Sequence, residues 1–163
     1  MAKRKNGGVL GRFLAFLVIV IMIVMIVGAV LMFFVAPDPS KVDNKYKDND
    51  NVSVAVVGEY LGGLAPLGQA EAALVLGWYG YSNSSLLENV KTTVNISYTE
   101  KDGDNTVTYT ASIIYFKNIK DANTARDGVK DNAKKDGKIA MFRGKALVVG
   151  DKKAALKYYA VLF

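Results

Sequence analysis

The chain lacks cysteine and histidine altogether, and it contains only three prolines among its 163 residues. Without these two residue types there is no thiol nucleophile, no imidazole general base and neither of the commonest zinc ligands. Disulfides are excluded as well, so any folded part must rely on its own hydrophobic core. An exported protein without disulfides is more typical of a prokaryotic surface than of a eukaryotic one.

The familiar nucleotide-binding and hydrolase motifs are also missing. No Gly-x-Ser-x-Gly, Gly-x-x-x-x-Gly-Lys-Ser/Thr or Gly-x-Gly-x-x-Gly pattern occurs. Carboxylates are among the catalytic groups that remain, and Glu59, Glu71 and Glu88 have the most apolar neighbours. A polar position on a buried helix explains Glu71 more simply than catalysis does. The acidic run 48–51 lacks the glycine and distal glutamate of a calcium loop. We therefore expect no catalytic residue, no cofactor and no metal site.

Charge of either sign is absent from residues 13–36, which form one apolar run of 24 residues. At about 1.5 Å per residue, a helix of this length crosses a hydrocarbon core of roughly 30 Å. A signal peptide usually has a shorter apolar region and a small-x-small cleavage site, and here the run ends Phe34-Val35-Ala36-Pro37. A buried soluble helix is rarely this long. The run predicts a retained transmembrane helix in contact with the lipid bilayer.

The flanks of this run predict its orientation. Residues 1–12 carry four of the 21 basic residues and no acidic one, so we expect them to form a cytoplasmic tail. The remainder then lies outside the cytoplasm, on a cell membrane. It holds 17 basic and 15 acidic residues, a net charge of only +2. The pI near 9.4 is therefore no sign of nucleic-acid binding.

Residues 37–51 are polar, mixed in charge and almost without apolar side chains. We interpret them as a flexible linker, for which square-root scaling gives a root-mean-square reach of roughly 20 Å. Residues 52–163 are long enough to bury a core and are expected to form one extracytoplasmic domain.

Two hairpins are predicted within this domain, at 92–116 and 138–149. In the first, apolar and polar residues alternate on both sides of Asp102-Gly103. A two-residue turn at that dipeptide would pair Ile96 with Tyr109 and place both apolar faces together.

Helical periodicity occurs at 66–81 and 121–136. The first segment repeats Leu67, Ala70, Leu74, Trp78 and Tyr81 at spacings of three and four, which indicates a buried helix with close approaches at two glycines, Gly68 and Gly77.

The second segment places small apolar residues on one side, followed by Gly137 as a stop; these residues are Ala122, Ala125, Val129 and Ala133. Residues 152–163 fit helix or strand equally well. The sequence thus predicts an α+β fold: a transmembrane helix, then an antiparallel sheet with two or three helices.

The aromatic cluster Trp78, Tyr79 and Tyr81 is the best candidate for a binding surface, although core packing by Trp78 and loop filling by the tyrosines explain it more simply. The leading hypothesis is a single-pass surface protein with a non-catalytic domain for binding, assembly or sensing, whose partner is a membrane or cell-surface protein. The alternative is a pilin-like filament subunit, because a short basic leader, Gly7, Gly8 and a long apolar helix resemble prepilins. A membrane-tethered hydrolase is the third hypothesis, which no motif supports.

Overall fold

The computed structural model describes residues 7–58 and 65–161. The chain divides into two compact units, residues 1–32 and residues 33–163, and each unit is described by itself.

The first unit consists of helix α1, Gly7–Phe34, whose last residues belong to the second unit. Within α1, Gly11–Leu31 has a mean hydropathy of 3.3 and is long and apolar enough to cross a membrane. The helix ends three residues before Pro37, which has no N–H to donate and disfavours helical backbone in the residue before it. The predicted long apolar helix is present, and it begins inside the segment expected to be a cytoplasmic tail.

The interpretation of residues 37–51 as a flexible linker is wrong, because helix α2, Pro39–Tyr46, forms there. Asp38 caps it by accepting the Ser40 N–H at 3.0 Å, and Pro39 fits the first helical turn. Val42 and Tyr46, four residues apart, are both buried in the domain core. Two apolar side chains at helical spacing are enough to hold this short helix, because Asp38 caps its N-terminus and the sheet provides a face for the side chains to pack against.

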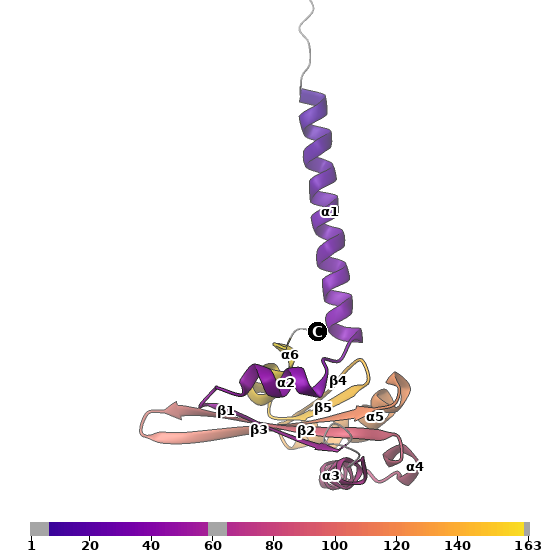
Figure 1. Ribbon diagram of the computed structural model, residues 1–163, viewed down its shortest axis with the longest axis vertical. Helices are drawn as coiled ribbons and strands as arrows, with labels where there is room; N and C mark the ends of the chain where they lie inside the picture. The colour runs from indigo at the N-terminus through magenta and orange to yellow at the C-terminus, as the bar shows by residue number, and fades with distance from the viewer. Residues whose placement is uncertain (1–6, 59–64, 162–163) are drawn as a thin grey trace, which may run out of the picture. The chain divides into compact units, whose positions relative to one another are not determined.

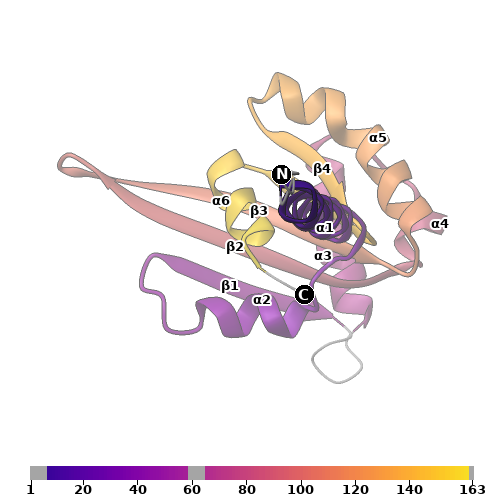
Figure 2. The same ribbon diagram turned by 90° about the horizontal axis from the view of Figure 1, so that it is seen from above.

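The domain is built on one antiparallel sheet of five strands in the order β1-β2-β3-β5-β4 (Figure 1). Both predicted hairpins are present, and the fold is α+β. The strands are β1 Val52–Gly58, β2 Val90–Asp102, β3 Asn105–Phe116, β4 Ile139–Arg143 and β5 Ala146–Gly150. The β2–β3 hairpin extends beyond its neighbours as a two-stranded ribbon (Figure 2).

The register of the β2–β3 hairpin differs from the predicted one by two residues. Ile96 pairs with Ala111, and Asp102 pairs with Asn105, so the turn is Gly103-Asp104. Gly103 has φ +63°, as the first central residue of a type II′ turn requires. A shift of two residues leaves every side chain on its own face, and the alternating pattern therefore cannot distinguish the two registers.

Helices cover both faces of the sheet. On one face α2 and α6, Lys152–Tyr159, enclose a core with Val94, Ile113 and Val148. On the other face α3, Ala65–Trp78, α4, Ser84–Leu87, and α5, Ile119–Lys135, enclose a second core. The described part of the domain thus has five helices instead of two or three, because α2 and α4 are short and α6 occupies the ambiguous C-terminal segment.

The predicted buried face is correct for α5 and wrong for α3. Helix α5 buries the four predicted residues, Ala122, Ala125, Val129 and Ala133. In α3 the predicted stripe is wrong, because Leu67, Leu74 and Trp78 are 52%, 58% and 72% exposed. The apolar side chains that α3 buries among the described residues are those of Ala72, Val75 and Leu76.

The two glycines of α3 also behave differently. Gly68 approaches the backbone of β1 and β2 closely, as predicted, whereas a Cβ at Gly77 would meet no atom within 4 Å. The expected close approach at Gly77 is therefore wrong.

Candidate functional site

The three residues of the predicted aromatic surface do not share one environment: Trp78 is exposed, whereas Tyr79 and Tyr81 pack against α5. Trp78 is exposed at the end of α3. Tyr79 and Tyr81 are half-buried beside α5: the Asn132 side-chain amide donates to the Tyr79 carbonyl at 2.7 Å, and the Tyr81 ring fills the space above Gly128. The two tyrosines thus join α3 to α5, and none of the three residues lines the pocket described below.

The candidate carboxylates do not assemble a catalytic group in the described residues. Glu71 accepts a hydrogen bond from the Asn95 amide at 2.7 Å, and the oxygen of that amide accepts from the Ser112 hydroxyl at 2.7 Å. Glu88 is exposed next to α4, and Glu59 lies outside the described residues. Among residues 7–58 and 65–161, no group of three or more acidic side chains is arranged to hold a metal ion.

A different site is formed where the chain leaves α1 and enters the domain. Arg143, at the end of β4, is fully buried and donates to three backbone carbonyls. These belong to Val35 at 3.1 Å, Tyr158 at 3.3 Å and Val161 at 3.0 Å. One guanidinium group therefore connects the segment after α1 to the C-terminal end of the fold. We refer to Arg143 and these three carbonyls as the exit clamp.

Tyrosine rings complete the surroundings of Arg143. Its guanidinium carbon lies 5.6 Å from the centre of the Tyr158 ring and 5.9 Å from that of Tyr159. Burial raises the pKa of Tyr159 to about 12, although the charge of Arg143 opposes this shift. The net rise leaves the phenol neutral at physiological pH, and its ring attracts the cation through its π face.

Two further contacts hold residues 34–37 against the sheet. The buried Tyr115 hydroxyl donates to the Pro37 carbonyl at 2.9 Å. Gly144 follows Arg143 with φ +55°, and a Cβ there would lie 2.5 Å from the Phe34 carbonyl oxygen. Only glycine combines this backbone conformation with such a close approach. The segment after α1 is therefore a packed part of the domain.

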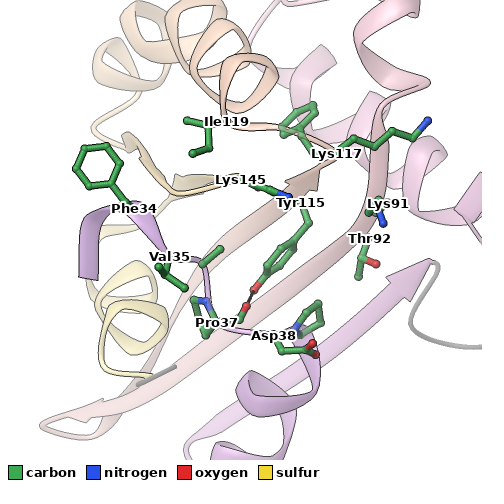
Figure 3. Close-up of a pocket in the computed structure, with 13 residues that line it drawn as sticks. Phe34, Val35, Pro37, Asp38, Lys91, Thr92, Tyr115, Lys117, Ile119 and Lys145 are labelled. Atoms are coloured by element: carbon green, nitrogen blue, oxygen red, sulfur yellow. Dashed lines mark hydrogen bonds between the residues drawn. The ribbon is translucent and has the colours of Figure 1, made fainter. Parts of the chain in front are cut away.

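Beside this segment lies a pocket of about 590 Å³, which we call the exit pocket (Figure 3). All of its lining residues belong to the domain unit. They come from the exit segment, the start of β2, the end of β3, the start of α5 and the β4–β5 turn. The lining consists of residues 34–39, 91, 92, 115–117, 119 and 145.

A β-bulge shapes one wall of the exit pocket. Val90 pairs with Phe116 and Thr92 with Tyr115, which leaves Lys91 as the extra residue of β2. Neighbouring residues of a regular strand point to opposite faces, but a bulge redirects one of them. Lys91 and Thr92 consequently both line the pocket.

The charge of the exit pocket is predominantly positive. Lys91, Lys117 and Lys145 border it, with Asp38 as the acidic residue in its lining. The Asp38 carboxylate already accepts the N–H and the hydroxyl of Ser40 as the cap of α2. Lys117 donates to the Glu88 carbonyl at 3.1 Å and extends away from Tyr115 in Figure 3. Lys91 and Lys145 are the other two cations of the lining.

Sequence reasoning missed this site because its residues are far apart along the chain. The signals were present but weak: three isolated lysines, a Gly after Arg143, and apolar residues next to Pro37.

Comparisons with protein-family models, with curated proteins and with solved structures give no match for this chain. The chain is thus described by its own features, an N-terminal apolar helix and an α+β domain with a lysine-lined pocket.

Proposed function

We propose that this chain is a single-pass membrane protein that presents a non-catalytic α+β domain for binding, assembly or sensing at the cell surface. The observation that carries the proposal is the Gly11–Leu31 segment of α1, with its mean hydropathy of 3.3 and its exposed side chains. Exposure of so many large apolar side chains to water costs about 25 cal/mol for each Å² of apolar surface. A bilayer removes that cost.

The exit clamp supports a domain that works close to the membrane. Only three residues separate Leu31, the end of the apolar segment, from Val35, whose carbonyl Arg143 binds. Even a fully extended chain over this stretch spans no more than about 14 Å. The domain is thus restricted to a partner at the membrane surface, in a way that a flexible linker would not achieve.

The basic residues before the span support a cytoplasmic N-terminus and an extracytoplasmic domain. Since the chain has no cysteine, single cysteines report topology without background. We would label Asn6→Cys and Asp104→Cys variants of the full chain with a membrane-impermeant maleimide in intact cells. Asp104 lies in the exposed turn between β2 and β3.

The expected result is that Asp104→Cys reacts in intact cells and Asn6→Cys reacts only after permeabilisation. Both variants should remain in the membrane fraction after alkaline carbonate extraction. Recovery of the chain in the soluble fraction would contradict the membrane proposal. The reverse labelling pattern would contradict only the orientation.

A further inference from the structure

We propose that the exit pocket binds the anionic phosphate headgroup of a membrane phospholipid. The inference rests on the proposed function, because it places the bilayer as the source of the ligand. Its structural basis is a cavity of about 590 Å³ that combines lysines with exposed apolar side chains.

The position of the pocket along the chain argues for a lipid. Phe34 lines it and follows Leu31 by three helical residues, which corresponds to a rise of roughly 5 Å. The headgroup layer beside a hydrocarbon core is of the order of 5 Å thick or more on each side. Phe34 itself is therefore at headgroup depth when Gly11–Leu31 spans the bilayer.

The chemistry of the lining fits the two parts of a phospholipid near its glycerol. Lys91 and Lys145 supply positive charge, and Thr92 adds a hydroxyl group. Phe34 and Ile119 are 56% and 40% exposed although they are large and apolar. Cations beside exposed apolar side chains suit an anionic group that is covalently attached to hydrocarbon.

The bulge at Lys91 is a second observation in favour of a built site. A regular β2 would direct Lys91 to the opposite face of the sheet from Thr92, away from the pocket. The extra residue brings both to the same wall. Gly58 approaches the Lys91 carbonyl so closely that a Cβ would lie 2.6 Å away, so the backbone of β1 packs directly against the bulge.

The test uses the full chain in detergent micelles and measures lipid binding by native mass spectrometry during titration with phosphatidylglycerol. The variant is Lys91→Gln with Lys145→Gln. Since a lysine near an anionic lipid contributes a factor of about five, the pair should weaken binding about thirtyfold. The matched control, Lys101→Gln with Lys134→Gln, removes the same charge from exposed positions outside the pocket and should bind like the wild type.

Competition identifies the source of the phosphate. We expect sn-glycerol 3-phosphate and inorganic phosphate to displace phosphatidylglycerol only weakly, and Ile119→Ala to weaken the lipid but neither soluble phosphate. Displacement by inorganic phosphate at the same concentration as the lipid would overturn the lipid assignment in favour of a soluble phosphate ligand. Equal binding by the pocket variant and the control would overturn the site itself.

The proposed function has its own readout, so the two failures are distinguishable. The Lys91 and Lys145 variant should stay in carbonate-washed membranes, because α1 is unchanged. A wild-type chain that leaves the membrane contradicts the proposed function. A chain that stays there while binding phosphatidylcholine as tightly as phosphatidylglycerol contradicts this inference alone.

Discussion

Arg143 shows how one buried cation organises a junction. Backbone carbonyls near chain ends and exit segments have no regular ladder partner, and a buried carbonyl without a donor costs free energy. The guanidinium carries donors in a planar fork, so it serves Val35, Tyr158 and Val161 together. A lysine at this position would present one compact charge and would not reach three separate carbonyls in the same way.

Replacement of Arg143 by methionine should therefore lower the free energy of unfolding by about 3 kcal/mol, because the buried carbonyls lose a shared donor. Near-ultraviolet circular dichroism of the full chain in detergent, followed during urea titration, measures this loss. Arg126→Met is the control: Arg126 is half-buried and pairs at 2.8 Å with the exposed Asp127, so its loss should cost no more than about 1 kcal/mol. Equal losses for the two variants would contradict the clamp.

Asp151 makes the stability of the domain depend on pH. Burial opposes its ionisation, but the Lys138 ammonium at 2.7 Å and the Thr110 N–H at 3.0 Å outweigh that effect and hold its pKa below the usual value. A lowered folded-state pKa stabilises the fold above the unfolded pKa of about 3.9. That stabilisation is lost as the pH falls through the folded pKa.

Asp151→Asn should accordingly lower the free energy of unfolding by about 1 kcal/mol near neutral pH. The difference from the wild type should shrink toward zero as the pH falls from about 3.9 through the lower folded-state pKa, since the folded wild-type carboxyl becomes neutral there. Urea midpoints across this range provide the measurement. A constant deficit for Asp151→Asn across this pH range would argue against the ionised contact.

At the scale of elements, the sequence predicted what repeats regularly. Alternation identified β2 and β3, and the spacing of small residues identified the buried face of α5. It did not identify α2, since Val42 and Tyr46 gain their burial from a sheet face that local sequence does not specify. It chose the wrong face of α3, which is apolar on several sides, so the packing partner and not the periodicity decides which residues are buried.

The contact between α3 and the sheet leads to a paired prediction. A Cβ at Gly68 would lie 2.9 Å from the Val57 carbonyl oxygen and 3.1 Å from the Gly58 Cα, both backbone atoms with little freedom to move. We expect Gly68→Ala to destabilise the domain by about 2 kcal/mol, despite the better helix propensity of alanine.

Gly77→Ala in the same helix is the matched variant. A Cβ there meets no atom within 4 Å, so the propensity gain of about 0.5–1 kcal/mol should appear as stabilisation. Urea titration of both variants gives the comparison. Stabilisation by alanine at both positions would contradict the close approach of α3 to β1.

At the scale of the whole molecule, the order of apolar helix and α+β domain could be predicted because each has its own composition. The exit pocket could not be predicted, since Lys91, Tyr115 and Lys145 meet only through strand pairing and a bulge. The domain also begins earlier than expected, at residue 33 instead of 52. The polar composition of residues 37–51 gave no sign of this, because they hold few apolar side chains. Two of these, Val42 and Tyr46, are nevertheless buried in the domain core.

The mature N-terminus separates the anchor from the pilin-like alternative. A retained anchor keeps Lys3, Arg4 and Lys5, the charges that favour a cytoplasmic N-terminus, so intact mass spectrometry should give about the full 17.7 kDa, with or without the initiator methionine. Cleavage after Gly8 would remove these charges and leave Arg12 as the basic residue before the apolar run. A mature chain that begins at Val9 or Arg12 would thus support the filament subunit, because its helix would then owe its position to packing against other copies and not to a basic cytoplasmic flank.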